Sequence, residues 1–290
     1  MSLAPCNGLI RAVDLHVHLP LPAWLEGSMG PYREGAARFF RGEVQERTVD
    51  ELAVEYAQEQ LFGILLAWDA ETATHRPPLS NDLVSAIVQR HPKRFAFFAS
   101  VDPWKANAVS ELERAVTELG AIGAKFHPSM QDFYPSDERH FAIWEKAAEL
   151  KIPCLFHTGT SGIGAGQPGG QGIKLDPSRP IHLDIVAARF PTLQLIAAHF
   201  GWPWHLELIA MALHKTNIFI ELSGWSPRYY PAELVREIAG RLQDRTLFGS
   251  DYPFIKPVRV LEELDALDLK PEAKVKILRE NAARLLKLQL

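Results

Sequence analysis

The sequence predicts an α/β fold, a TIM-type (β/α)8 barrel built from a single domain of residues 1–290. Short apolar runs typical of strands alternate with helix-forming segments along the whole chain. This alternation is typical of parallel strands joined by right-handed helical crossovers. About eight strand–helix units are present, which is the number that closes a barrel. No linker or low-complexity tract divides the sequence, so we expect one domain.

The predicted strands are short apolar runs, and the helices between them have apolar residues at helical spacing. The strands cover residues 9–19, 63–68, 95–101, 123–127, 153–158, 193–199, 217–223 and 246–251. The helices cover residues 50–60, 81–90, 106–119, 138–150, 181–190, 204–213, 231–242 and 258–267, with a closing amphipathic helix at 271–288. Gly120, Pro92 and Pro191 mark the ends of three of these helices.

Two connections are longer than the others, and long connections in a compact domain are often functional. They cover residues 20–47 and 159–179. The glycines of the second connection predict a mobile lid, because glycine permits unusual backbone angles and close approach to a ligand. Residues 164–169 fit the pattern G-x-G-x-x-G, but no helix follows directly and Pro168 interrupts the motif. A nucleotide-binding loop is therefore not predicted here.

The composition is that of an ordinary globular protein, with 47% hydrophobic and 23% charged residues. A net charge of -4 provides no basic field for nucleic acid or anionic membranes. Two cysteines, Cys6 and Cys154, are too few for a disulfide framework. The first residues lack a basic segment followed by a long apolar core, and no run of some eighteen apolar residues occurs, so we expect neither a signal peptide nor a membrane span. We expect a cytoplasmic protein with a small-molecule substrate and no nucleic-acid or membrane partner.

Residues suited to metal binding and catalysis gather at the ends of the predicted strands. They are His16 and His18 at the first strand, Lys125 and His127 at the fourth, His157 at the fifth, His199 at the sixth and Asp251 at the eighth. The C-terminal ends of parallel barrel strands share one rim, so these side chains should converge. A lone histidine on a strand is more often a packed core residue, but five histidines at one rim predict a metal or catalytic centre. By strand alternation, Asp14 should share the face of His16.

Four motifs resemble those of the amidohydrolase superfamily. They are Asp14-x-His16-x-His18, residues 155–159 around His157, residues 198–201 around His199, and residues 248–253 around Asp251. The resemblance is strongest to the amidohydrolase-related branch, which includes aminocarboxymuconate semialdehyde decarboxylase and resorcylate-type decarboxylases. It extends to the closing helix and covers nearly the whole chain. The glycine-rich stretch after His157, with residues 202–204 and 222–227, is most similar to hydroxyphenyl-β-ketoacyl-CoA hydrolases.

The resemblance implies a ligand set for one divalent metal ion, expected to be zinc, with manganese as the alternative. The implied ligands are His16, His18, His157 and Asp251. Asp251 would also accept a proton from metal-activated water, and His199 would polarise the substrate or shuttle protons. The simpler alternatives are that Asp251 caps a turn and that His199 has a structural role.

Four further residues are expected to contact the substrate. Lys125 stands where some superfamily members carry a carboxylated lysine between two metal ions, but the mononuclear branch favours a buried partner or a substrate-binding cation beside His127. Trp225 and Tyr229 are expected to form an aromatic wall, or else to pack at the rim.

The expected activity is that of a metal-dependent hydrolase acting on a carbonyl-containing small molecule, such as an aromatic β-ketoacyl-CoA cleaved between two carbons. Arg33, Arg38 and Arg41 would then meet the anionic tail, or they form a solvated helix face. The alternative activity is non-oxidative decarboxylation of an aromatic or muconate-like acid. A third alternative is a metal-binding scaffold without activity. Members of this branch often pair, so a homodimer is also an expectation.

Overall fold

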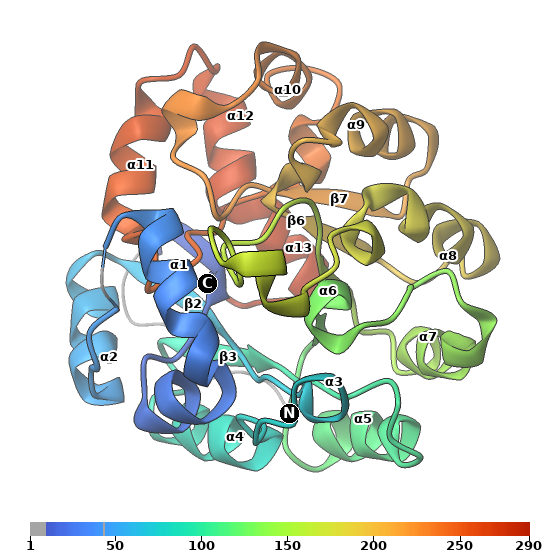
Figure 1. The fold of residues 1–290 in the computed structure, drawn as a ribbon. Helices are drawn as coiled ribbons and strands as arrows, with labels where there is room; N and C mark the ends of the chain where they lie inside the picture. The colour runs from blue at the N-terminus through green and yellow to red at the C-terminus, as the bar shows by residue number, and fades with distance from the viewer. Residues whose placement is uncertain (1–9, 43) are drawn as a thin grey trace.

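Eight parallel strands form a closed barrel in the computed structural model, which describes residues 10–42 and 44–290 (Figure 1). The strands are β1 (Ala12–Val17), β2 (Leu61–Leu66), β3 (Phe95–Phe98), β4 (Ala124–Phe126), β5 (Cys154–His157), β6 (Leu195–Ala198), β7 (Ile218–Glu221) and β8 (Thr246–Leu247). They form two hydrogen-bonded sheets, β1–β3 and β4–β8. Parallel bridges from Ala99 to Ala124 and from Val17 to Tyr252 join the sheets at both seams. The predicted fold class is confirmed.

Helices surround the barrel, as Figure 1 shows. They are α2 (Val49–Gln58), α4 (Asn81–Arg90), α5 (Ala108–Thr117), α7 (Phe141–Glu149), α8 (Asp184–Arg189), α9 (His205–His214), α10 (Ala232–Ile238), α11 (Pro257–Asp265), α12 (Pro271–Val275) and α13 (Asn281–Leu286). Capping side chains fix where two of these helices begin. Thr48 and Glu51 form a capping box at the N-terminus of α2, and the Ser80 side chain caps the N-terminus of α4. No helix among the described residues is long and apolar enough to cross a membrane.

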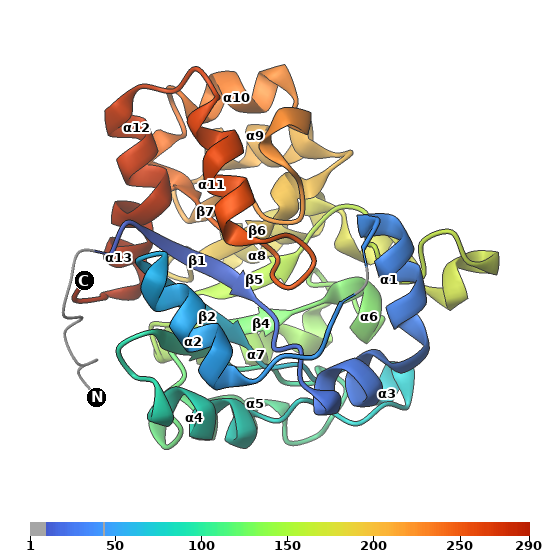
Figure 2. The ribbon, with the colours of Figure 1, turned by 90° about the vertical axis from the view of Figure 1, so that its left-hand side faces the viewer.

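Three further helices lie in connections at the carboxyl ends of the strands and were not predicted. They are α1 (Arg33–Phe40), α3 (Glu71–Thr74) and α6 (Pro128–Gln131). In Figure 2, α1 and the loop of residues 159–179 project from one end of the barrel, and α13 lies at the opposite end. α13 closes that end, because Leu286 packs in one cluster with the interior strand residues Val13, Leu155 and Ile196. The open end is therefore the one to which the strands point.

A β-bulge interrupts the first strand. Asp14 lies opposite Gly63 of β2, whereas Val17 lies opposite Leu65, so three steps along β1 match two steps along its partner. An extra residue in one strand reverses the faces to which the following side chains point. The bulge therefore divides β1 into two halves of opposite orientation.

The two halves of β1 differ in what they place inside the barrel. Before the bulge, Val13 and Leu15 point inward and join the interior apolar cluster. After it, His16 and His18 line the cavity at the open end. Asp14 points outward, toward the surrounding helices, so the prediction that it shares the face of His16 is wrong. Regular alternation fails here because the bulge inserts one residue.

Asp14 is fully buried and connects β1 with α2 and with the segment after β8. Its carboxylate accepts hydrogen bonds from the Tyr56 hydroxyl (2.8 Å), and from the Ser250 backbone N–H (2.8 Å) and hydroxyl (2.6 Å). Burial raises its pKa to about 6, and the hydrogen bonds from Ser250 and Tyr56 oppose this rise. Asp14 therefore fixes the bulged strand from its outer side.

We predict that Tyr56→Phe lowers the free energy of unfolding by about 1–3 kcal/mol, the usual cost of removing a buried hydrogen bond to a carboxylate. The matched control is Tyr229→Phe, because the Tyr229 side chain is exposed and its hydroxyl has no hydrogen-bond partner among the described residues. The control should change stability by less than about 0.5 kcal/mol. Urea denaturation measures both values. Equal stability of the two variants would contradict the conclusion that Asp14 stabilises the bulged strand through its hydrogen bond from Tyr56.

Candidate metal centre

Side chains from the carboxyl ends of the strands converge on one cavity at the open end of the barrel. The predicted site residues that line it are His16, His18, Lys125, His127, His157, His199, Trp225 and Asp251. The histidines, Lys125 and Asp251 are all buried. Their convergence follows from the parallel topology, which brings every strand end to the same rim.

Three predicted ligands already have the spacing of a metal site. Nε2 of His16 and Nε2 of His18 each lie 3.5 Å from Oδ1 of Asp251. The potential ligand atoms of these three residues all lie within 4.8 Å of one another. Two ligands about 2.1 Å from a common ion are roughly 3.0–3.4 Å apart in octahedral or tetrahedral coordination. The three residues therefore fit a divalent cation once the Lys125 ammonium, which contacts Nε2 of His16, moves aside.

His157 lies in the same cavity but outside this group of three. Its Nε2 lies 3.2 Å from the carbonyl oxygen of Thr160. A carbonyl only accepts, so Nε2 carries the proton in that contact and Nδ1 is left free. The ring stacks on His127 with centroids 3.8 Å apart and lies 4.7 Å from the ring of His199. His157 can become a ligand through Nδ1, or through Nε2 if the contact with Thr160 is released.

Glu221 and Ser223 lie beneath the histidines and were not predicted. Oε2 of Glu221 lies 3.2 Å from Nδ1 of His16 and accepts a 2.7 Å hydrogen bond from the Ser223 hydroxyl. The same hydroxyl oxygen lies 3.1 Å from Nδ1 of His16 and 3.0 Å from Nδ1 of His199. Burial raises the pKa of Glu221 to about 8, and the hydrogen bonds from Ser223 and the charge of Lys125 oppose this rise. When Glu221 is ionised, both rings carry their proton on Nδ1 and keep the lone pair on Nε2. The pair thus selects the tautomer that metal binding by His16 needs.

Two glycines make room for this arrangement. A Cβ atom at Gly249 would lie 1.8 Å from Oε1 of Glu221, and one at Gly224 would lie 2.4 Å from Nδ1 of His199. Any larger residue would displace the carboxylate or the imidazole. The glycine within the sequence Phe248–Asp251 is therefore required by the buried glutamate.

The backbone is strained at two site residues. His199 has φ 59° and Asp251 has φ 70°, which lie in the left-handed region that non-glycine residues rarely adopt. Backbone hydrogen bonds hold the second of these, because Asp251 N–H donates to the carbonyl of His16. Strain of this kind typically persists where a side chain has to be aimed at a functional site.

Burial controls the charges in the cavity. It lowers the pKa of His199 to about 4 and holds the pKa of His16 well below its usual range, so both imidazoles are neutral at neutral pH. Burial opposes ionisation of Asp251, but the hydrogen bond to His18 and nearby positive charges keep its pKa below the usual value. Neutral imidazoles and an ionised carboxylate are the forms that bind a metal ion.

The predicted substrate-binding residues fall into two groups. Lys125 is buried, and its Nζ lies 3.1 Å from Nε2 of His16. Burial lowers its pKa to about 8. His127 and Trp225 line the same cavity. Tyr229 lies apart, with 57% exposure, and lines a neighbouring outer cavity instead.

Aromatic side chains form much of the cavity wall. They are Trp24, Phe39, Phe40, Trp68, Trp225 and Phe254. Trp24 stacks on His18 with the planes 8° apart, so it also orients a candidate ligand. Phe40 stacks on Phe254 with centroids 4.6 Å apart, which connects α1 to the segment after β8. The unpredicted helix α1 thus supplies part of the cover over the centre.

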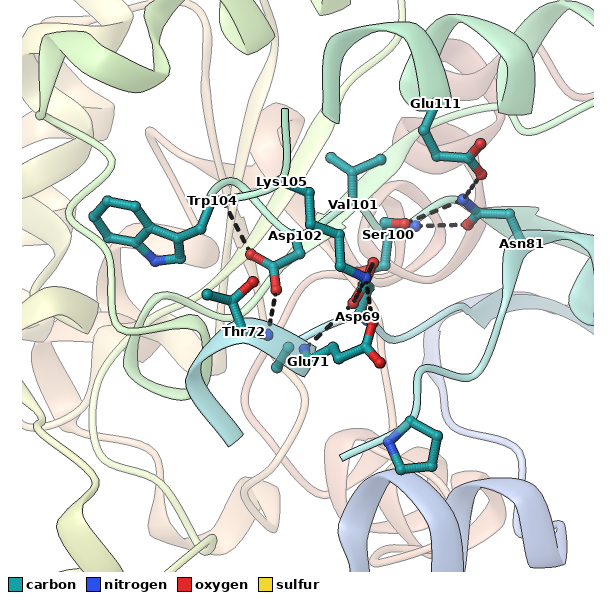
Figure 3. Close-up of polar contacts among 12 residues, drawn as sticks. Asp69, Glu71, Thr72, Asn81, Ser100, Val101, Asp102, Trp104, Lys105 and Glu111 are labelled. Carbon is teal, nitrogen blue, oxygen red and sulfur yellow. Dashed lines mark hydrogen bonds and ion pairs between the residues drawn. The ribbon is translucent and has the colours of Figure 1, made fainter. Parts of the chain in front are cut away.

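A polar network next to the cavity holds the loops after β2 and β3 together (Figure 3). Lys105 Nζ lies 2.9 Å from a carboxylate oxygen of Asp69 and 2.7 Å from one of Glu71. Asp102 accepts a 2.7 Å hydrogen bond from the backbone N–H of Thr72. Because Asp69 directly follows Trp68, these contacts fix the position of one aromatic wall residue.

Sequence reasoning missed Glu221 because it ends an apolar strand and resembles a solvated strand terminus. The available signal was the pattern Ile218–Glu221 followed by Ser223, in which two polar residues separated by one share a strand face at the rim. At Asp14 the error was different. Strand alternation predicted that its side chain shares the face of His16, but the β-bulge turns the two side chains to opposite faces of the strand.

Comparison with known proteins identifies the family. The amidohydrolase family model matches residues 13–288. The chain belongs to this family. This amidohydrolase is 27% identical over 257 residues to decarboxylase orsB of Emericella nidulans, covering 73% of this chain and 76% of that protein. It is 25% identical over 251 residues to gamma-resorcylate decarboxylase of Rhodococcus jostii, covering 72% and 75%.

Solved structures share the fold. An uncharacterized TIM-barrel protein of Bordetella bronchiseptica has a TM-score of 0.81 at 23% identity, covering 95% of this chain and 98% of that one. A 2,6-dihydroxybenzoate decarboxylase in complex with 2,6-dihydroxybenzoate has a TM-score of 0.71 at 20% identity, covering 97% and 100%. A Polaromonas dihydroxybenzoic acid decarboxylase with bound manganese has a TM-score of 0.72 at 19% identity, covering 96% and 97%.

The comparisons confirm the predicted superfamily and branch. They do not support the finer resemblance to hydroxyphenyl-β-ketoacyl-CoA hydrolases, because the relatives described above are named as decarboxylases, among them a gamma-resorcylate and a 2,6-dihydroxybenzoate decarboxylase. Of the two predicted activities, they favour the alternative over the main one.

We predict that Glu221→Gln weakens metal binding about 10- to 100-fold, the usual effect of losing a carboxylate behind a ligating histidine. Competition with a chelating dye measures the dissociation constant of Mn²⁺ or Zn²⁺. The matched control is Glu237→Gln, since Glu237 is equally buried but pairs with Arg241 on the outer helix layer. Unchanged affinity in Glu221→Gln, or equal loss in both variants, would argue against the proposed orientation of His16.

Gly249→Ala should also weaken metal binding, because the new methyl group occupies the position of the Glu221 carboxylate. Gly240→Ala is the control, as its Cβ would approach only the Arg236 carbonyl at 3.5 Å. Overpacking of this kind typically costs about 1–3 kcal/mol of stability. A Gly249→Ala protein with native stability and native metal affinity would show that Glu221 does not occupy this position.

Proposed function

We propose that this amidohydrolase is a metal-dependent carboxy-lyase that removes carbon dioxide from a hydroxylated aromatic acid without oxidation. The observation that carries the proposal is the placement of the His16–His18–Asp251 group in a cavity with an aromatic wall. Such a cavity accepts a planar ring while its polar end meets a carboxylate. Relatives named as resorcylate and dihydroxybenzoate decarboxylases support this substrate class.

A divalent cation fits the proposed ligands His16, His18, His157 and Asp251, and manganese is the ion bound by a relative of the same fold. When bound, such an ion would supply Lewis-acid stabilisation of negative charge on the substrate. Imidazole nitrogens and a carboxylate oxygen suit both manganese and zinc. The neutral state of His16 and the ionised state of Asp251 prepare the site for either ion.

Residues of the chain provide the remaining requirements of the reaction. The substrate ring lies against the aromatic wall, and the buried Lys125 provides a cation for its carboxylate or phenolate. One proton must reach the ring carbon that carries the carboxylate; the bond to that carboxylate then breaks and its electron pair returns to the ring. His199 lines the cavity with Nδ1 held by Ser223, so its Nε2 can take a proton from solvent water and pass it to the ring carbon. Asp251 lines the same cavity and is the second residue positioned to transfer this proton.

The direct test is product analysis with the manganese-loaded protein and 2,6-dihydroxybenzoate or its isomers. We expect one carbon dioxide and one phenolic product for each acid consumed, and in D₂O one deuterium on the carbon that lost the carboxylate. Incorporation of oxygen from labelled water into an organic product, without carbon dioxide release, would instead establish hydrolysis and overturn the proposal.

Asp251→Asn should lower the turnover number by about 100-fold or more, the range for loss of a proton-transfer or charge-stabilising group. Asp132→Asn is the control, since Asp132 is exposed at the surface, where it pairs with Lys174. Circular dichroism should show that both variants stay folded. Native turnover by the metal-loaded Asp251→Asn protein would remove Asp251 from the proposed centre.

A further inference from the structure

A second cavity lies outside the metal cavity, beyond part of its aromatic wall. It is open to solvent and, with its mouth included, has a volume of about 1090 Å³. The two cavities share the residues Phe39, Phe40, Gly224, Trp225 and Phe254. The side chains of these residues form the wall between the two spaces, so a ligand that displaces part of this wall can occupy both.

Basic residues dominate the polar lining of the outer cavity. Arg41 follows α1, Arg228 lies in the connection after β7, and Arg259 lies on α11, so three separate segments supply one guanidinium each (Figure 1). No aspartate or glutamate is among the lining residues. The whole chain has a net charge of -4, so a cavity lined by three arginines and no carboxylate differs in sign of charge from the chain as a whole.

Two of the three guanidinium groups are unpaired. Arg259 donates a 2.9 Å hydrogen bond to Glu263. The Arg41 side chain has no hydrogen bond or ion pair with any described residue. Arg228 has none either, and its guanidinium carbon lies 4.8 Å from the ring centre of Tyr229. Arg41 and Arg228 therefore remain available for a ligand.

The other arginines near the cavity differ in this respect. Arg33 donates to the carbonyl of Val44 at 2.6 Å, and Arg38 forms a 2.7 Å ion pair with Glu34. Of the three arginines that the sequence offered for an anionic group, only Arg41 lines the outer cavity. The positive lining thus depends on residues that the fold brings together from distant segments.

We propose that the outer cavity binds a second anionic group of the substrate, carried on an arm that extends from the aromatic ring. The inference rests on the proposed carboxy-lyase activity and specifies its substrate class. The ring and its reacting carboxylate occupy the metal cavity. Phe39 and Trp225 pack edge to face with ring centroids 6.2 Å apart, so these two side chains turn aside to let the arm pass, and its end meets Arg41 and Arg228. Guanidinium groups match both carboxylate and phosphate through paired N–H donors. The arm itself gains apolar contact with the shared aromatic wall.

The test compares four acids that share the 2,6-dihydroxybenzoate ring. One has no arm, and three carry an arm opposite the carboxylate: a propyl, a carboxypropyl or a phosphopropyl group. We expect the two charged arms to raise kcat/KM at least tenfold over the propyl arm, mainly through a lower KM. The ratio of kcat/KM for the acid with the carboxylate arm to kcat/KM for the acid with the phosphate arm identifies which anion the cavity prefers.

Three variants locate the effect. Arg41→Gln and Arg228→Gln should each reduce the preference for charged over propyl arms by about fivefold or more, whereas Arg38→Gln should leave that ratio unchanged. Equal kcat/KM for charged and propyl arms in the wild-type protein would overturn the proposal, as would an equal loss in Arg38→Gln.

A binding measurement separates this proposal from the proposed activity. Calorimetric titration of the metal-loaded protein with the charged and propyl acids should give the same preference and the same dependence on Arg41 and Arg228, even if no acid is turned over. Absence of turnover with this binding preference would reject the carboxy-lyase activity alone. Turnover without the preference would reject the outer anion site alone.

Discussion

The β-bulge in β1 is the constraint on which the candidate metal centre depends. Without the extra residue between Asp14 and Val17, regular alternation would keep Asp14 and His16 on one face, and with Val13 and Leu15 inside the barrel both would point outward. The bulge lets one short strand fill the barrel interior with apolar residues below and present two imidazoles above. It also places the Asp14 carboxylate in the helix layer, where Tyr56 and Ser250 satisfy it.

The same strand aligns the centre with β8. Asp251 N–H donates to the carbonyl of His16, and His18 N–H donates to the carbonyl of Tyr252, at 3.1 and 2.8 Å. These backbone bonds hold Asp251 in its left-handed conformation and bring its carboxylate to the two imidazoles. Glu221 then orients His16 from below, in the space that Gly249 leaves open. The positions of these side chains therefore follow from backbone geometry before any ligand binds.

Much of this arrangement was predictable from the sequence, because hydrophobic periodicity is a local property. The alternation of strands and helices predicted the barrel, and the barrel predicted that His16, His157 and Asp251 would meet at one rim. Features that depend on tertiary contacts were missed. The bulge has no glycine or proline to mark it, Glu221 has the appearance of a strand end, and α1 lies inside a long connection to which no helix was assigned.

The most direct test of a metal centre built on the bulged strand is anomalous diffraction from crystals of the protein soaked in Mn²⁺. We expect one strong anomalous peak in the barrel, within about 2.4 Å of Nε2 of His16, Nε2 of His18 and a carboxylate oxygen of Asp251. A crystal in which Mn²⁺ binds elsewhere and leaves these three atoms without a peak would contradict the assignment of this rim as the metal centre.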